Sequence, residues 1–323
     1  MYSFQSIDAI STLYDTKIIF PKARWYFTFQ QPETPNIFST HDNALAARLR
    51  RAQKPAYDAL PSYEYAVDDC ASIFASKLAS FIPNDATQSD TFDLGWWLTC
   101  FAFDVNGEIT FSKRFGHLDS GKDIGNIAGA LAERLDYCAQ VGIYHELHPF
   151  FWKIIGLLTY IMKQIDYTFV FTMERMKEHE PRAADEKAKG SSRTKTPDML
   201  TRLMELNQTD PENFSQHDVV IGAYTSIVAG ADTTWMSLGS TMFFLHRYPQ
   251  TLARLREEID DFAAAGKISD PITWEEAKNM PYVNAVIKEA QRLYAPVALP
   301  LWRTVPEGGA MIEGKWFKEG VST

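Results

Sequence analysis

The stretch AGADTT (229–234) places small, acidic and alcohol side chains in the middle of a segment that otherwise has helical character. Gly costs about 1 kcal/mol relative to Ala in a helix interior, and Asp and Thr are also weak helix formers. Because natural sequences are mostly self-consistent, such a local violation often marks a functional site. The small residues Ala229, Gly230 and Ala231 would leave a shallow groove, along which something flat could approach the helix backbone closely.

Asp232 and Thr233 could act together as a proton relay at this level of the helix. The Thr233 hydroxyl either bonds back to a carbonyl one turn earlier, which bends a helix, or faces a cavity and admits water. An acid beside an alcohol at a buried bend is suited to general acid–base chemistry. The alternative is a helix–helix crossing, where small residues permit close packing. That alternative gives no reason for Asp232, since a buried carboxylate is costly unless it is paired.

Glu289 and Arg292 form a second constellation, in KEAQRL (288–293). They are three residues apart and therefore share a helix face. As a surface pair they would contribute only about 0.2–0.5 kcal/mol. The residues on both sides, at 286–287 and 293–294, are apolar and favour a buried pair. A buried pair would need further hydrogen bonds to be tolerated.

A metal site is disfavoured at HELH (145–148), although His145 and His148 would share a helix face. The spacing is not that of HExxH, there is no third ligand, and the proline that follows indicates a helix end or a loop. We therefore predict no metal ligands among the side chains of this chain.

The composition, 46% hydrophobic in 323 residues, is enough for a large core. The net charge of −9 excludes an extended basic surface for nucleic acid. Cys70, Cys100 and Cys138 are widely spaced, which favours small buried hydrophobes over a disulfide framework and fits a reducing compartment. No run is long enough to span a membrane; the best, at 150–162, predicts a buried or peripheral helix.

Helical periodicity dominates the rest of the sequence, so the predicted fold class is mainly α. A capping box at Ser215 and Asp218 opens the longest segment, which ends near residue 246. The segment 92–111 is apolar on nearly all sides and should be buried. We predict loops over 83–90 and 180–196, the second a mobile surface loop, and a small β portion after residue 296. The other predicted helices are 42–57 (N-cap Asp42), 61–82, 123–142, 149–179, 197–206, 249–266 and 281–294.

AGADTT and EAQR, in this order and at this spacing, resemble two motifs of the cytochrome P450 family of haem-thiolate monooxygenases. The connecting RYPQTLARLREEID and MPYVNAVIKEAQRLYAP are similar to the family's helices. DLGWWLTCFAFDVNGEITFSKRFG resembles a fungal branch that includes pisatin demethylase-like and benzoate hydroxylase-like enzymes. The resemblance covers essentially the whole chain. It implies a single partial cytochrome P450 domain over 1–323, truncated at both ends.

The resemblance also implies roles for residues on the long helix. Asp232 and Thr233 would deliver protons to iron-bound dioxygen, and Ala229 and Gly230 would lie against the haem face. Glu289 would form a structural ion pair with Arg292 beneath the haem.

Two arginines would hold the haem propionates, because the guanidinium geometry suits a carboxylate. Arg303 follows the EAQR helix, and Arg50 falls where the family places another such Arg. Ala46 stands where the family often has His or Trp four residues earlier, so Arg48 and Arg51 remain alternatives to Arg50.

The resemblance further implies haem b, O2, and electrons from NADPH through a cytochrome P450 reductase. Apolar segments at 23–29, 140–175 and 297–301 would contact a small hydrophobic or aromatic substrate, although 23–29 could equally be a core strand. The full-length protein would belong to the endoplasmic reticulum membrane, and this chain alone would be soluble and intracellular.

The family's iron ligand is a cysteine in a loop of the form Phe-x-x-Gly-x-Arg-x-Cys-x-Gly, and the sequence contains no such loop. None of its three cysteines has the flanking Gly and Arg. A thiolate ligand favours O–O cleavage. We therefore expect the chain as written not to be a competent monooxygenase. The alternative is a non-catalytic relic or interaction protein that keeps the same helical scaffold.

Overall fold

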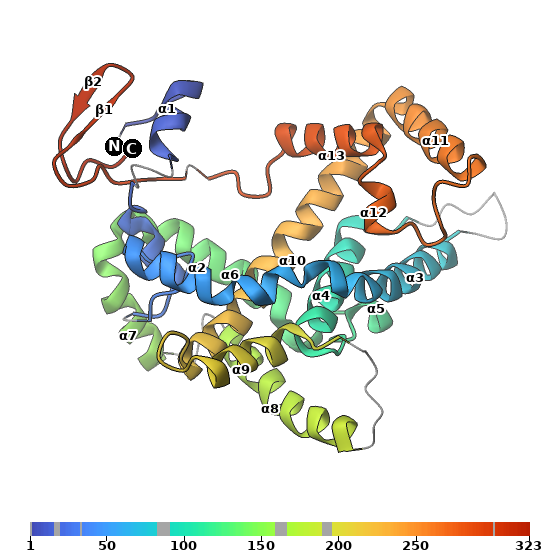
Figure 1. Cartoon of the computed structure of the whole chain (residues 1–323), viewed down its shortest axis with the longest axis horizontal. Coiled ribbons are helices and arrows are strands. Elements are labelled where there is room, and N and C mark those ends of the chain that lie inside the picture. The colour runs from blue at the N-terminus through green and yellow to red at the C-terminus, as the bar shows by residue number, and fades with distance from the viewer. Residues whose placement is uncertain are drawn as a thin grey trace.

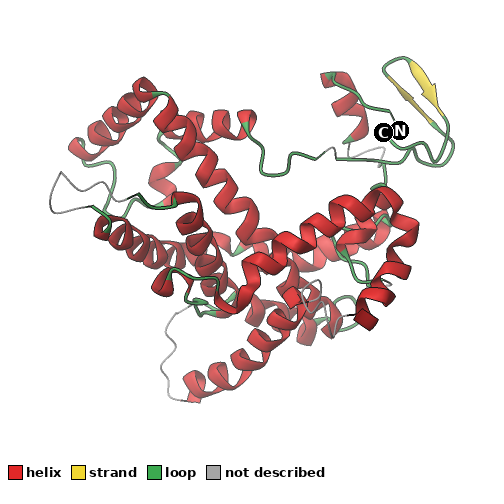
Figure 2. Cartoon of the chain, turned by 180° about the vertical axis from the view of Figure 1, so that it is seen from behind, coloured by secondary structure: helices red, strands yellow, loops and turns green. Residues whose placement is uncertain are grey.

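The computed structural model describes residues 2–15, 20–32, 34–82, 91–158, 167–188, 196–299 and 301–323. Helices make up most of these residues, with one short two-stranded antiparallel sheet (Figure 2). The predicted mainly α class with a small β portion is confirmed.

The longest helix, α10 (Gln216–Arg247), runs through the middle of the molecule (Figure 1). Its start is fixed by the predicted capping box: the Ser215 hydroxyl accepts from the Asp218 amide, and the Asp218 carboxylate accepts from the Ser215 amide at 2.8 Å. Its last turn carries His246 and Arg247, where positive charge opposes the helix dipole. At 32 residues the helix is about 48 Å long, so it can position a site and also anchor the core on both sides of it.

The remaining elements surround α10 or extend from its ends. Helices of the body are α2 (Asn43–Asp58), α3 (Glu64–Ser80), α4 (Leu94–Phe111), α5 (His117–Ser120), α6 (Ile127–Val141), α7 (His148–Leu158), α8 (Tyr167–Ala188) and α9 (Met199–Thr209). Beyond α10 lie α11 (Pro249–Ala264), α12 (Trp274–Ala277) and α13 (Pro281–Leu293). Short 3-10 helices are η1 (Arg24–Phe29), η2 (Leu60–Tyr63), η3 (Ile124–Asn126) and η4 (Gly142–Leu147).

The two ends of the chain meet in one corner of the molecule (Figure 1). There α1 (Ile7–Leu13) packs with the hairpin of β1 (Ala310–Ile312) and β2 (Lys315–Phe317). A small apolar cluster holds this corner together, contributed by Ala9, Leu13, Phe20, Val305, Ile312 and Phe317.

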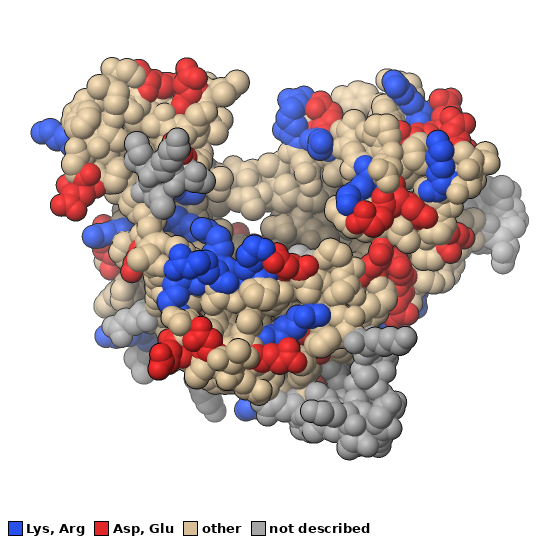
Figure 3. All heavy atoms as spheres, in the orientation of Figure 1, with Lys and Arg blue, Asp and Glu red and all other residues tan. Residues whose placement is uncertain are grey.

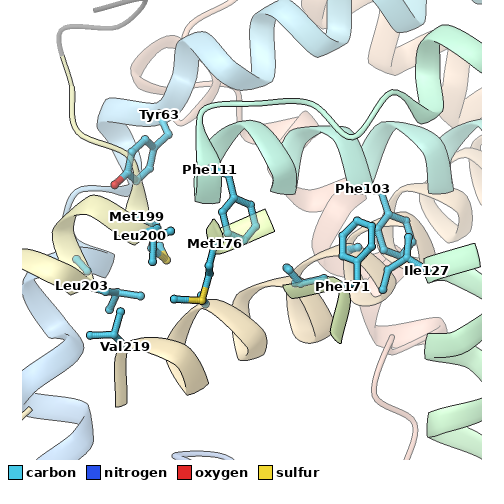
Figure 4. Packing of buried hydrophobic residues seen from close by; sticks show 14 of the residues in the cluster. Tyr63, Phe103, Phe111, Ile127, Phe171, Met176, Met199, Leu200, Leu203 and Val219 are labelled. Atoms are coloured by element: carbon cyan, nitrogen blue, oxygen red, sulfur yellow. The ribbon is translucent and has the colours of Figure 1, made fainter. Parts of the chain in front are cut away.

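The main core is built where α4, α8 and α9 pack on α10 (Figure 4). Phe103 and Phe111 of α4, Phe171 of α8, Leu203 of α9 and Ile227 of α10 are all buried in it. The prediction that 92–111 is a buried helix is confirmed, because apolar residues on all its faces find neighbours on several helices.

Helix α4 packs closely against α10 at Gly230. A Cβ placed there would lie 2.2 Å from Nδ2 of Asn106, so only glycine leaves room for the Asn106 amide. That amide donates to the Ser226 carbonyl at 2.7 Å, and its oxygen accepts from the Thr110 hydroxyl at 3.1 Å. Gly230 therefore has a packing function, whatever else it does.

A buried charge cluster joins α4, α5 and α6. His117 is fully buried, with Nδ1 3.6 Å from an Asp104 oxygen and Nε2 3.6 Å from an Asp123 oxygen. Burial alone would lower the pKa of His117, but the two carboxylates outweigh it and raise the pKa above its ordinary value. His117 is thus held as a cation between two anions.

The structure differs from the sequence prediction in three places. Helix α8 continues through Ala188, so the loop predicted over 180–196 is wrong for 180–188, where Glu, Ala and Lys favour helix. Residues 189–195 and the loop predicted over 83–90 lie outside the described residues. The segment 23–29 is largely the 3-10 helix η1 rather than a strand, and near Arg303 the chain forms only isolated bridges.

No helix in the described ranges is long and apolar enough to cross a membrane. The predicted helix within 150–162 is present as α7, which is described as far as Leu158.

We expect the Gly230–Asn106 contact to show as strong coupling in a double-mutant cycle. G230A alone should destabilise the fold by about 1–3 kcal/mol, because the new methyl overlaps the Asn106 amide. In an N106A background the same change should be neutral, or stabilising by up to about 1 kcal/mol, as Ala is the better helix former. Urea unfolding of the four proteins measures the coupling.

Gly239 provides the matched control in the same helix, because a Cβ there would meet nothing closer than 3.8 Å. G239A should not be destabilising in either background. Additive effects of G230A and N106A would contradict the packing function of Gly230.

The His117 cluster predicts a pH-dependent contribution to stability. Because the folded pKa is raised, the contribution is fully present below the unfolded pKa of about 6.5 and is lost as pH rises through the folded pKa. The free energy of unfolding of wild type minus that of H117Q should therefore shrink between pH 6 and pH 9. H246Q, at an exposed histidine, should show no such trend. A gap that stays constant or widens with pH would disprove the charged state of His117.

Candidate functional site

A cavity of about 410 Å³ opens between α4 and α10, beside the AGADTT stretch. It is mostly apolar, with a few hydroxyl and amide groups at its wall. From α10 it is lined by Thr225, Ser226, Ala229, Gly230 and Thr234, from α4 by Ala102, Val105, Asn106, Ile109 and Thr110, and at its ends by Tyr57 and Met199. The unusual stretch thus forms one wall of a hollow in the molecule.

Both threonines of the stretch bond back into their own helix. The Thr233 hydroxyl donates to the Ala229 carbonyl at 2.9 Å, and the Thr234 hydroxyl donates to the Gly230 carbonyl at 2.6 Å. Of the two orientations considered for Thr233, the structure has the one that is bonded back. Ala229, Gly230 and Thr234 line the cavity, whereas Thr233 is not among its lining residues.

Asp232 is half-buried and has a partner that the sequence analysis did not identify. The indole Nε1 of Trp235 donates to the Asp232 carboxylate at 2.9 Å. An indole N–H can only donate, so this bond fixes the orientation of the Asp232 side chain. The available signal was the spacing: an acid and a Trp three apart share a helix face.

The Glu289–Arg292 pair forms, but the expectation that it is buried is wrong. Arg292 donates to both Glu289 carboxylate oxygens at 2.7 Å, the bidentate geometry typical of guanidinium and carboxylate. The Glu289 side chain is 56% exposed and the Arg292 side chain is 67% exposed. The apolar flanks do not bury them, because Ile287 and Leu293 are themselves exposed.

The two arginines predicted to hold propionates converge on one lysine. Lys22 and Arg303 form an antiparallel bridge between the two ends of the chain. Burial, followed by the charges of Arg303 and Arg50, lowers the pKa of Lys22 to about 8. The Lys22 ammonium donates to the carbonyls of Ile37 and Phe38, both at 2.7 Å. We call Lys22, Arg50 and Arg303 the cation cluster.

Arg48 and Arg51, the alternatives to Arg50, are placed differently. Arg48 donates to the Asn213 carbonyl, and its Nη1 lies 3.7 Å from a carboxylate oxygen of Asp218. Its side chain therefore interacts with the start of α10. Arg51 is exposed on α2, as is Arg50. Lys and Arg side chains gather over α2 in the space-filling view (Figure 3). Only Arg50 of the three lowers the pKa of Lys22.

Arg303 is held by its own segment and by one aromatic ring. Its Nη1 donates to the carbonyls of Leu301 and Trp302, both at 3.1 Å. Its guanidinium lies 4.9 Å from the ring centre of Tyr14, whose hydroxyl donates to the Leu301 carbonyl at 2.9 Å. The proximity of Lys22 and Tyr14 to Arg303 could not be predicted from local sequence, because both come from the distant N-terminal end of the chain.

Two of the segments expected to contact a substrate lie against each other. Helix η1 packs on η4, where a side chain at Gly142 would collide with the Trp25 indole. Trp25 also meets Trp302, with ring centres 4.6 Å apart. The aromatic segment 23–29 is thereby joined to the region just after 297–301.

His148 of the HELH segment is satisfied by hydrogen bonds. Its Nδ1 accepts from the Tyr137 hydroxyl at 2.7 Å, and its Nε2 donates to the Gln30 carbonyl at 3.0 Å. Burial lowers the pKa of His148, so the ring is neutral. His145 lies 3.1 Å from its neighbour Glu146. Among the residues that the structure describes, no three His, Cys, Asp or Glu side chains are grouped to hold a metal ion.

All three cysteines are buried free thiols, as predicted. Burial, with nearby carboxylates, raises the pKa of Cys70 and of Cys100 to about 12. Burial also raises the pKa of Cys138. Each is therefore a protonated thiol at neutral pH, and a thiolate is the form that binds iron.

Several known proteins are similar to this chain. A pisatin demethylase from Fusarium vanettenii is 32% identical over 325 residues, which is 99% of this chain and 61% of that protein. The cytochrome P450 monooxygenase mfmA from Annulohypoxylon moriforme is 32% identical and matches 99% of this chain and 63% of its own length. The chain thus spans about three fifths of these relatives.

The fold has a solved counterpart as well. A crystal structure of a cytochrome P450 (CYP102L1) superposes with a TM-score of 0.73 at 15% identity, and the match covers 98% of this chain and 65% of the other. The family model for cytochrome P450 matches residues 5–322. The long central helix, the AGADTT stretch and the Glu289–Arg292 pair therefore belong to a known architecture: this chain is a member of the cytochrome P450 family.

Proposed function

We propose that this chain is the haem- and oxygen-binding part of a monooxygenase that inserts one oxygen atom of O2 into a small hydrophobic or aromatic substrate. The single observation that carries the proposal is the cation cluster. Its three positive side chains converge, and none makes an ion pair with a carboxylate in the described part of the chain. Two carboxylates on one planar ligand would complete it.

Two groups of residues would suit a haem: the cation cluster would face its propionates, and Ala229 and Gly230 would face the macrocycle. The propionates would be held by Arg50, Arg303 and Lys22, as guanidinium and ammonium groups are suited to carboxylates. Ala229 has no side chain beyond Cβ and Gly230 has none. Asn106 fills the side of Gly230 where a Cβ would stand, so a flat macrocycle would approach α10 from another side of these two residues. Burial, followed by the charges of Arg303 and Arg50, lowers the pKa of Lys22, and a bound carboxylate would favour its charged form.

Haem, when bound, would supply the iron at which O2 is activated. The chain would supply protons. The Thr233 hydroxyl can rotate away from the Ala229 carbonyl, to which it donates at 2.9 Å, and donate into the groove instead. Asp232 would be the second proton-carrying group of this relay. The Trp235 bond keeps the Asp232 carboxylate oriented while it does so.

The substrate side would be formed by η1, η4 and the segment around Trp302, which meet through Trp25. Their aromatic composition favours a small hydrophobic or aromatic molecule. Electrons would come from NADPH through a cytochrome P450 reductase. The name of one relative, pisatin demethylase, is consistent with an oxidative enzyme.

The chain as written would lack monooxygenase activity, because its three thiols are buried and protonated. Without a thiolate on the iron, O–O cleavage is disfavoured. A haem-binding but non-catalytic protein is therefore the second candidate function for this polypeptide, and the raised pKa values of its cysteines favour it.

The cation cluster predicts how haem binding depends on the propionates. Wild type should bind haem at least about ten-fold more tightly than haem dimethyl ester, in which both carboxylates are blocked. R303M and K22M should each lose most of that preference, because one charge-assisted hydrogen bond contributes about 1.5–3 kcal/mol. Titration followed by Soret absorbance measures both affinities.

R51M is the matched control, because Arg51 is the exposed neighbour of Arg50 on the same helix. It should keep the full preference for haem over the ester. Equal affinities in wild type, or equal losses in R51M and R303M, would overturn the assignment of the propionate site.

The cysteine chemistry predicts the second outcome. The haem-loaded chain, given NADPH and a reductase, should form no hydroxylated product, and its carbon monoxide complex should lack the spectrum of a thiolate-ligated haem. A variant with Ser at Cys70, Cys100 and Cys138 should give the same spectrum as wild type. Thiolate ligation lost in that variant would show that one of the three thiols does reach the iron.

A further inference from the structure

A buried guanidinium on α6 has one nitrogen, Nη1, that finds no hydrogen-bond acceptor in the described part of the chain. Arg134 is only 3% exposed, although arginine is almost never buried without a partner. Its Nη2 donates to the Gln30 carbonyl at a long 3.5 Å, and its Nη1 has no hydrogen-bond partner. A buried N–H group of a charged side chain is costly to leave unpaired.

Aromatic rings enclose this guanidinium. Its central carbon lies 5.0 Å from the ring centre of Trp152 on α7 and 5.6 Å from that of Tyr137 on α6. The side chain of Tyr224, on α10, also makes a hydrogen bond with the guanidinium. Rings of this kind stabilise a cation through their faces but provide no negative charge. The positive charge of Arg134 therefore stays unneutralised.

The polar groups of Tyr137, His148 and Gln30, which lie next to Arg134, form hydrogen bonds with each other. The Tyr137 hydroxyl donates to His148, and His148 donates to the same Gln30 carbonyl that Arg134 contacts. His148 is neutral, since burial lowers its pKa. No carboxylate in the described part of the chain makes an ion pair with Arg134. Two needs of Arg134 are left in this arrangement: a hydrogen-bond acceptor for Nη1 and a negative charge opposite the guanidinium.

Arg175 on α8 is a similar arginine whose charge the protein neutralises, although its buried Nε also has no hydrogen-bond partner. Its guanidinium lies 5.1 Å from the Phe171 ring centre, but it also pairs with the Glu178 carboxylate at 2.9 Å. Arg134 has the aromatic contacts and lacks the carboxylate. The missing partner would be an anion that is not part of the protein.

The position of Arg134 indicates where that anion would come from. Arg134 lies where the end of η1, the start of α7 and α10 meet, within the segments proposed to contact the substrate. Tyr224 is five residues before Ala229, about 7.5 Å along the helix axis. Arg134 therefore meets α10 within about one and a half turns of the AGADTT stretch.

We propose that Arg134 binds the carboxylate of an aromatic acid substrate. The Nη1 group and the positive charge would both be satisfied by one carboxylate oxygen, and the Trp152 and Tyr137 rings would exclude water from the ion pair. The oxidation of that substrate rests on the proposed haem function. The binding itself needs no iron, so it can be tested separately.

The test compares an acid with its neutral isostere. Isothermal titration calorimetry of the purified chain, with and without added haem, would measure Kd for 2-naphthoate and for 2-naphthalenemethanol. Wild type should bind the acid at least about ten-fold more tightly, the strength of a charge-assisted hydrogen bond. R134M should lose this preference, while its affinity for the alcohol changes less than about two-fold, because Met keeps the apolar volume.

R175M is the matched control, since it removes an aromatic-packed arginine that already has its own carboxylate. It should keep the preference for the acid. R134K, which retains the charge without the planar fork, should keep part of it and decides the matter if R134M does not fold.

Two results would overturn the proposal: equal affinity of wild type for acid and alcohol, or a preference for the acid that survives in R134M. A preference lost in R303M and kept in R134M would move the anion to the cation cluster and also overturn it. Soret titration of the same samples reports haem binding on its own. Failure of the haem function is therefore distinguishable from failure of carboxylate recognition.

Discussion

The contact between α4 and α10 at Gly230 is the constraint on which the rest of the site depends. Because a Cβ would collide with Asn106 there, the two helices can approach only where glycine stands. The Asn106 amide then bonds the Ser226 carbonyl, one turn before the AGADTT stretch. This contact buries α4 and forms the wall of the cavity. It also fixes the position of Asp232 and Thr233 relative to α4.

A second constraint is electrostatic and joins the two ends of the chain. Lys22 comes from the N-terminal segment and Arg303 from the segment after α13, and the two meet through a backbone bridge (Figure 1). Like charges repel, so this convergence costs free energy unless a ligand offsets it. Arg134 shows the same condition in a more buried form. In this account, both sites are built for carboxylates that the protein does not supply.

Local sequence signals predicted the helices well. The capping box at Ser215 predicted the start of α10, and the apolar character of α4 on all sides predicted its burial. These features succeed because their causes lie within a few residues: a side chain that accepts the free amides, or a period that matches the helix. The prediction that the residue types of AGADTT mark a site on this helix stays a prediction.

Tertiary partners could not be read in the same way. Trp235 beside Asp232 was within reach of a spacing rule, but Lys22 beside Arg303 depends on which distant segments meet. The exposure of Glu289 also depends on neighbours, because apolar flanks favour burial only if something covers them. Helix α8 extends beyond its predicted end because Glu, Ala and Lys favour helix although they add little hydrophobicity. Low hydrophobicity alone therefore did not distinguish a loop from a helix there.

The most direct test of haem binding at the cation cluster is a crystal structure of the chain grown with haem. The account predicts density for the macrocycle along the Ala229–Gly230 side of α10, with its propionates in contact with Lys22, Arg50 and Arg303. A macrocycle bound elsewhere on the surface, or propionates directed away from these three side chains, would contradict it.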